Sequence, residues 1–174
     1  TQSLFEFSRK LTATSKPDDV LWLLASQAAA TVKGTSIVFL VKQGELTLET
    51  GWPPEDQLST SDWAAARWAH EKQEPAGQGT GTMPTARFHF RPIVGSKSTL
   101  GVLGVAGADA DETLSAQVVA ALRSFMEQAP IVLERMALAD QAAKAEASME
   151  SERIRSALLS SVSHDLRTPL ASIV

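Results

Sequence analysis

The sequence has no cysteine among its 174 residues. This absence excludes disulfide bonds, thiolate zinc sites and cysteine nucleophiles, and it is consistent with a cytosolic setting. No apolar run approaches the roughly 18 residues that a membrane-spanning helix needs, and there is no signal peptide. The sequence also lacks an excess of basic residues. It has 16 Lys and Arg and 20 Asp and Glu, which gives a net charge of −4. Non-specific nucleic-acid binding needs a basic face, so we expect no nucleic-acid partner.

The length suits one well-packed domain with an extension. Residue 1 is Thr rather than Met, and Val174 falls in the middle of an apolar pattern. We therefore expect the chain to be a piece of a longer protein, whose membrane segments would lie outside this piece.

Hydrophobic periodicity predicts helices and paired strands. The expected helices cover about residues 4–11, 18–31 and 60–72, and the expected strands cover residues 37–41, 46–50, 87–94 and 100–106. Thr60-Ser61-Asp62 is read as the capping start of the third helix. Short turns join successive strands and imply an antiparallel sheet, and helices at both ends imply cover on one face. The predicted fold class is α+β, with one antiparallel sheet and helices packed on one face, followed by a long C-terminal helix.

The long helix is expected from about residue 112 to residue 168. At 1.5 Å per residue it would span on the order of 80 Å, more than a small domain can bury. Apolar residues recur at steps of four and three from Phe125 through Ala129 to Ala143, which is a heptad pattern. Glu146 and Glu150 interrupt it before a similar register resumes. We therefore expect a coiled-coil signalling helix that pairs with a partner helix.

Near the end of this helix, the stretch Ser163-His164-Asp165-Leu166-Arg167-Thr168-Pro169-Leu170 places a histidine beside an acid. Asp165 can fix the tautomer of His164 and raise the basicity of its other ring nitrogen. Thr168 is four residues on, so its hydroxyl lies on the same helix face. Pro169 removes the hydrogen bond to the carbonyl of Asp165, so the helix should bend there. The pattern predicts a phosphate-accepting histidine; the alternative is an ordinary surface histidine.

This stretch resembles the phosphoacceptor box of sensor histidine kinases of two-component systems. The resemblance implies that His164 is autophosphorylated, that Asp165 is its acid–base helper and that Thr168 assists phosphatase activity towards the response regulator. It also implies ATP and Mg as cofactors of the full-length kinase, a cognate response regulator as partner, and a homodimer formed through the C-terminal helix. No nucleotide-binding box is present, so we expect this piece to hold no cofactor or metal and to be inactive alone.

Residues 1–135 resemble a GAF domain, a signal-sensing module, in the order of their predicted elements. The whole stretch, including Gly51-Trp52-Pro53-Pro54, is similar to the cytoplasmic region of potassium-responsive sensor kinases of the bacterial inner membrane. This implies a sensor domain over 1–135, and over 136–174 a signalling helix with the first part of the phosphoacceptor domain. The implied function is control of His164 phosphorylation and phosphotransfer in potassium or osmotic stress signalling. The alternative is a stand-alone small-molecule-binding GAF module with a structural helical tail.

Signals for a ligand pocket in the sensor region are weaker. Trp52 is expected in a loop, where it could form a pocket wall. His89 alternates with neighbouring phenylalanines, so it should point away from their face, and with Arg87 or Arg91 it could line a pocket or simply face water. The loop over residues 74–84 is rich in Gly and Pro and could cover the cavity, as such loops do in GAF domains. The ligand itself stays open.

Overall fold

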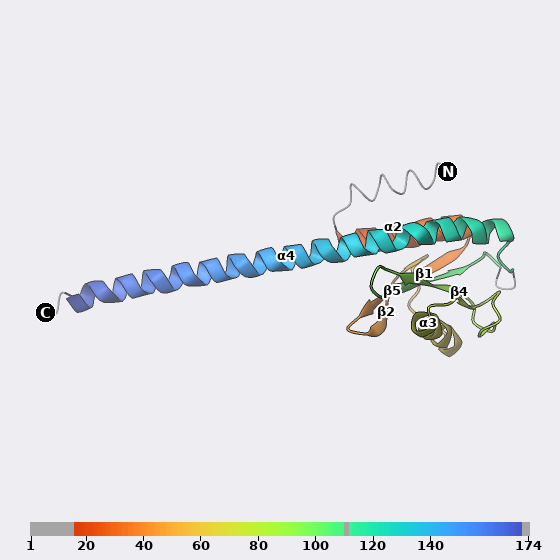
Figure 1. Ribbon diagram of the computed structural model, residues 1–174, viewed down its shortest axis with the longest axis horizontal. Coiled ribbons are helices and arrows are strands. Elements are labelled where there is room, and N and C mark those ends of the chain that lie inside the picture. The colour runs from red at the N-terminus through yellow and green to blue at the C-terminus, as the bar shows by residue number, and fades with distance from the viewer. Residues whose placement is uncertain (1–15, 110–111, 172–174) are drawn as a thin grey trace. The chain divides into compact units, whose positions relative to one another are not determined.

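The computed structural model describes residues 16–109 and 112–171 of the chain (Figure 1). It divides into a globular unit, which ends at Met136, and a helical unit, which begins at Ala137. The helix expected over residues 4–11 lies outside the described residues. No described helix combines the length and the apolar character needed to cross a membrane.

The core of the globular unit is one antiparallel sheet of five strands. The strands are β1 (Thr35–Lys42), β2 (Glu45–Trp52), β3 (Ala76–Gly77), β4 (His89–Val94) and β5 (Thr99–Ala106), in the order β2-β1-β5-β4-β3. The four strands predicted from alternation and turn residues are confirmed. The fifth, β3, has only two residues, so it carries no periodicity that a sequence pattern could reveal.

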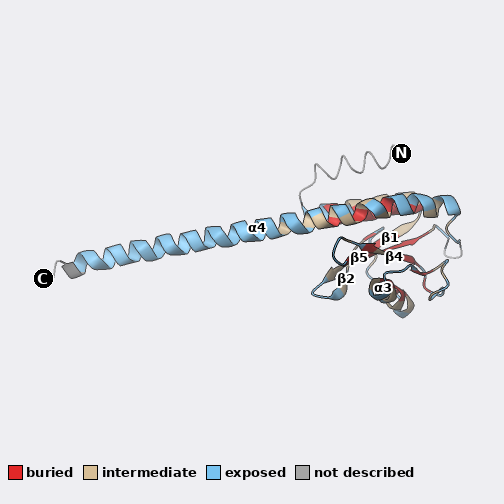
Figure 2. Ribbon diagram, viewed as in Figure 1, coloured by how far each residue is buried: buried red, intermediate tan, exposed pale blue. Residues whose placement is uncertain are grey.

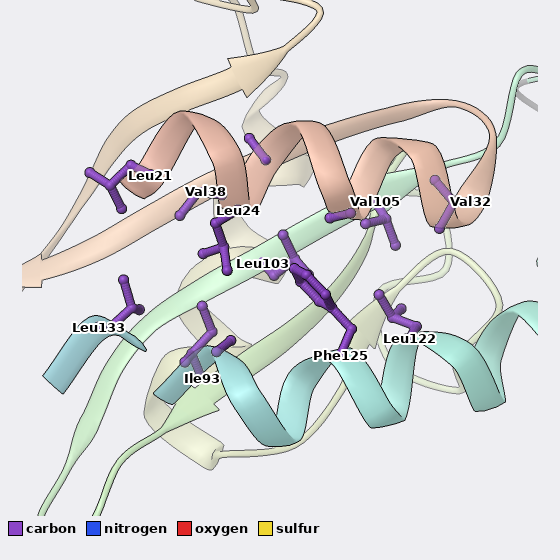
Figure 3. Close-up of a cluster of buried hydrophobic side chains, with 13 residues drawn as sticks. Leu21, Leu24, Val32, Val38, Ile93, Leu103, Val105, Leu122, Phe125 and Leu133 are labelled. Atoms are coloured by element: carbon purple, nitrogen blue, oxygen red, sulfur yellow. The ribbon is translucent and has the colours of Figure 1, made fainter. Parts of the chain in front are cut away.

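Helix α2 (Pro17–Val32) and the first part of α4 (Ala116–Ala171) cover one face of this sheet (Figure 1). We call it the α2–α4 face. Its core contains Leu24 from α2, Ile93 and Leu103 from the strands, and Leu122 and Phe125 from α4 (Figure 3). These side chains exclude water from the layer between helices and sheet, which is the main favourable contribution to folding.

Helix α3 (Thr60–Lys72) packs on the other face, which we call the α3 face. Its small residues Ala65, Ala66 and Ala69 lie in a second cluster with the rings of Phe39, Phe88 and Phe90. The prediction that helices cover one face of the sheet is therefore correct for α2 and α4. It is incomplete for α3, which covers the opposite face.

Helix α4 runs without a break through Pro130. Phe125, Ala129 and Leu133 are buried against the sheet, whereas every residue from 141 to 169 is exposed (Figure 2). The first members of the predicted heptad pattern, Phe125 and Ala129, thus belong to the core of the globular unit and not to a coiled coil.

Candidate functional site

His164 lies on the exposed helical surface of the helical unit. Its side chain is 83% exposed and that of Asp165 is 81% exposed, so both are accessible to an approaching protein or nucleotide. The neighbouring large side chains Leu158, Val162 and Leu166 are also exposed, at 62%, 54% and 59%. The candidate site is therefore an open helix face and not a cleft.

The Nδ1 atom of His164 is the ring nitrogen on the side of Asp165, 3.9 Å from its Oδ1 atom. This distance is too long for a hydrogen bond. In the tautomer that carries its proton on Nδ1, the ring has its lone pair on Nε2. This arrangement can present a neutral imidazole nitrogen as a nucleophile.

Thr168 lies one turn after the histidine, as the four-residue spacing predicts. Its Oγ1 hydroxyl donates a hydrogen bond to the main-chain carbonyl of His164 at 3.3 Å. Hydroxyls in helices often bond back to the preceding turn in this way. The hydroxyl would have to rotate away from this carbonyl in order to position a water beside the imidazole.

His89 is buried on the α2–α4 face, away from Phe88 and Phe90 as the alternation predicts. Its Nδ1 atom lies 2.9 Å from the carbonyl oxygen of Gln78, and its Nε2 atom accepts a hydrogen bond from Nε of Arg91 at 3.1 Å. A carbonyl only accepts, so Nδ1 carries the proton and the ring is neutral. Burial lowers the pKa of His89, the bond to Gln78 opposes this shift, and the charge of Arg91 adds to it. His89 is therefore a neutral residue that holds Arg91 in place.

Arg91 follows on the same face of β4 and is half-buried. Burial lowers its pKa, and the positive charge of Arg123 on α4 lowers it further. Sequence reasoning did not find Arg123, because one arginine on a helix gives no signal of what it faces across the fold.

Arg87 does not join this group. It precedes β4, and its main-chain N–H donates to Oδ1 of Asp62 at 2.9 Å. Its guanidinium pairs with Glu55 at 3.3 Å and lies 5.0 Å from the centre of the Phe88 ring. Arg87 therefore ties the loop before β4 to α3.

Trp52 is also separate from His89 and Arg91. It ends β2 and packs edge-to-face on Trp22 of α2, with ring centres 5.2 Å apart. Strands β1 and β5 lie between β2 and β4, a separation of about 14 Å at the usual strand spacing. The four candidate pocket residues thus occupy three places, and only His89 and Arg91 are in contact.

The loop predicted over residues 74–84 is held by its own hydrogen bonds. The Gly77 N–H donates to the Thr82 carbonyl at 2.8 Å, and the Thr80 hydroxyl lies 2.8 Å from the carbonyls of both Gly77 and Thr82. Strand β3 within it pairs with β4. These bonds hold the loop to the sheet edge; its role as a lid stays a prediction. Within residues 16–109 and 112–171, no three His, Cys, Asp or Glu side chains gather as a metal site would require.

Comparison with known proteins finds relatives along almost the whole chain. Sensor protein KdpD of Escherichia coli (strain K12) is 32% identical over 174 residues, which cover 98% of this chain and 19% of the relative. Sensor protein KdpD of Clostridium acetobutylicum is 31% identical over 180 residues, covering 99% of this chain and 20% of the relative. The chain thus spans about a fifth of the length of the curated relatives it matches.

Solved structures give the same fold. The GAF domain of the potassium sensor histidine kinase KdpD from Escherichia coli matches with a TM-score of 0.68 and 25% identity, covering 81% of this chain and 97% of that one. Residues 122 to 287 of a methyl-accepting chemotaxis protein match with a TM-score of 0.59 and 16% identity, over 76% and 97% of the two chains, a likeness of fold alone. The GAF domain family model matches residues 16–135. With the five-stranded sheet and its covering helices, this match places the chain in the GAF domain family.

Proposed function

We propose that this chain is the sensory and phosphoacceptor region of a two-component sensor histidine kinase of the KdpD type. Residues 1–135 are its sensor domain, and residues 136–174 are a signalling helix and the first part of the phosphoacceptor helix. His164 accepts the γ-phosphate of ATP and passes it to a cognate response regulator of the KdpE type, in potassium or osmotic stress signalling. ATP and Mg are bound by a domain elsewhere in the full-length protein, which membrane segments outside this chain anchor in the bacterial inner membrane.

The observation that carries the proposal is the exposure of His164 within the box Ser163–Leu170, since a phosphoacceptor must reach both a nucleotide and a second protein. The ring nitrogen Nε2 attacks the γ-phosphorus as the bond to the bridging oxygen of ADP breaks. Asp165 lies beside Nδ1 and stabilises the positive charge that develops on the ring. Similarity to KdpD over 98% of the chain supports the same role.

The α3 face supports a mainly mechanical role for the sensor domain. Phe39, Phe88 and Phe90 are fully buried there and pack against one another, with ring centres 5.9–6.2 Å apart. Closely packed rings transmit displacement because interiors resist compression. A shift of the sheet would therefore move the buried part of α4, which continues into the helical unit.

Phosphorylation in trans tests the proposal. The chain, extended through the rest of its phosphoacceptor hairpin, is mixed with the ATP-binding domain of a matching sensor kinase and radiolabelled ATP. We expect acid-labile label on the wild type and none on His164→Gln, because the amide of glutamine cannot attack phosphorus.

His70→Gln is the matched control, because His70 lies on α3, outside the box. It should be labelled like the wild type. Equal labelling of His164→Gln and the wild type contradicts the proposal and leaves the stand-alone GAF module as the better interpretation.

A further inference from the structure

We propose that Arg91 of β4 and Arg123 of α4 form a binding site for a phosphate-bearing anion at the margin of the α2–α4 face. Both arginines belong to the globular unit, and the proposed site does not depend on the kinase proposal.

The two arginines come together because of the packing of β4 against α4. Arg91 shares a strand face with Ile93, which is fully buried on the α2–α4 face. Arg123 lies between Leu122 and Phe125, whose side chains enter the same cluster from α4 (Figure 3).

Glu134 of α4 accepts the N–H of Ser96, just after β4. Arg123 lies eleven helical residues before Glu134, and Arg91 lies five residues before Ser96. Each arginine is therefore about 16 Å before that contact, one along α4 and the other along β4. The lowered pKa of Arg91, caused first by burial and then by the charge of Arg123, agrees with this placement. Strand and helix thus each contribute one guanidinium to the edge of the core.

Arg91 is oriented through one side of its guanidinium. Its Nε atom donates to Nε2 of His89 at 3.1 Å, and the proton on Nδ1 of His89 points to the Gln78 carbonyl. His89 is 8% exposed, so this pair is fixed by its surroundings. The terminal nitrogens of Arg91 make no hydrogen bond to any described side chain. They remain as donors for a ligand, held in one orientation before it arrives.

The charge of the half-buried Arg91 has no counter-charge among the described residues. Among the described residues, neither Arg91 nor Arg123 forms an ion pair, although Lys42 and Arg87 in the same unit do. His89 is neutral and supplies no compensating charge. Glu127 is one helical turn from Arg123 but forms no ion pair with it in the part of the chain that is described. Burial of an uncompensated charge is unfavourable, so an anion bound between the two arginines would mainly offset the charge of the half-buried Arg91.

The geometry favours phosphate among the common anions. A guanidinium donates two parallel hydrogen bonds to two oxygens of one anion, and a phosphate has enough oxygens for two such groups. Its charge near −2 at neutral pH also matches two arginines, whereas a carboxylate carries only one charge. An anion held in this way joins β4 to α4 and stabilises the packing of the helix that continues to His164.

Titration of the 174-residue chain with inorganic phosphate at low ionic strength tests the site, with isothermal calorimetry as the readout. We expect saturable binding with one site per chain. Arg123→Gln should weaken it by about tenfold or more, since a charge-assisted hydrogen bond is lost. Arg91→Gln should have the same effect. Arg123 is exposed, so its variant retains the fold even if Arg91→Gln does not.

Arg87→Gln is the matched control, because Arg87 is paired with Glu55 and lies apart from the two arginines of the site. It should bind phosphate like the wild type. Absence of saturable binding up to about 10 mM phosphate, a range that covers millimolar affinity, overturns the proposal. Equal weakening in Arg87→Gln and Arg123→Gln also overturns it, because the binding would then follow net charge.

Discussion

At the scale of single residues, Glu134 connects α4 to the turn between β4 and β5. One carboxylate oxygen accepts the Ser96 N–H at 2.7 Å and the Ser96 hydroxyl at 2.8 Å. The main-chain bond first, and then the side-chain bond, lower the pKa of Glu134. A carboxylate with a lowered pKa binds fewer protons in the folded state than in the unfolded state. Its contribution to stability is therefore present above the unfolded-state pKa and is lost as the pH falls through the folded-state pKa.

We predict that Glu134→Gln lowers the melting temperature near pH 7, and that its difference from the wild type shrinks as the pH falls from about 6 to about 3. Thermal unfolding followed by circular dichroism across this range measures the difference. Glu71→Gln serves as the control, because Glu71 is exposed on α3 and has no hydrogen bond to another described residue. A difference for Glu134→Gln that stays constant with pH would show that the charge of Glu134 is not what stabilises the turn.

Predictions about single residues succeeded where they depended only on neighbouring residues in the sequence. The direction of His89 followed from strand alternation, but its partner Gln78 lies eleven positions away, across β3 and β4. The start of α3 was displaced by one residue, since Ser59 is the N-cap and Asp62 completes a capping box with it. Asp62 also binds the Arg87 N–H, 25 positions later. Contacts over such separations leave no mark in a single sequence.

At the scale of elements, the strands were predictable because alternation and turn residues are local properties. The face chosen by α3 was not, because its alanines present no strong apolar stripe. The heptad pattern shows the opposite problem. The same heptad pattern runs through the part of α4 that packs on the sheet and through the part that is exposed. The pattern alone therefore could not show which residues belong to the core of the globular unit and which are free to pair with another helix.

The exposed apolar row Leu158, Val162 and Leu166 recurs at four-residue steps, so it occupies one side of α4. We predict that the chain self-associates through this side, and that Leu158→Glu weakens the association by about tenfold or more, the effect of losing one buried leucine per chain. Sedimentation equilibrium at several concentrations measures the constant. Ser160→Glu is the control, because Ser160 lies about 200° around the helix from Leu158. A chain that stays monomeric at every concentration, with its helix intact, contradicts the prediction.

At the scale of the whole molecule, the two units differ in what stabilises them. The buried apolar side chains described in the structure all belong to the globular unit, and the last of them along the chain is Leu133, at 2% exposed. The residues from 141 to 169 have no core of their own, and isolated helices gain little stability in water. The resemblance to a phosphoacceptor box could be found from the sequence because it is a short contiguous motif. The resemblance to a GAF domain likewise placed a domain boundary after residue 135. The heptad pattern alone gives no boundary, because it runs through both the buried and the exposed part of α4.

This difference predicts the result of two truncations. A chain that ends at Met136 keeps Leu133 and the bonds between Glu134 and Ser96, so its urea unfolding midpoint should equal that of the full chain. A chain that ends at Pro130 loses both, and the loss of the buried leucine alone should lower the free energy of unfolding by about 2–5 kcal/mol. The m-value should be nearly unchanged in the first chain, because residues 141–169 bury no side chain whose exposure on unfolding would add to the m-value. If both truncations lower the midpoint equally, the globular unit draws stability from the helical unit, and motion could pass between them in either direction.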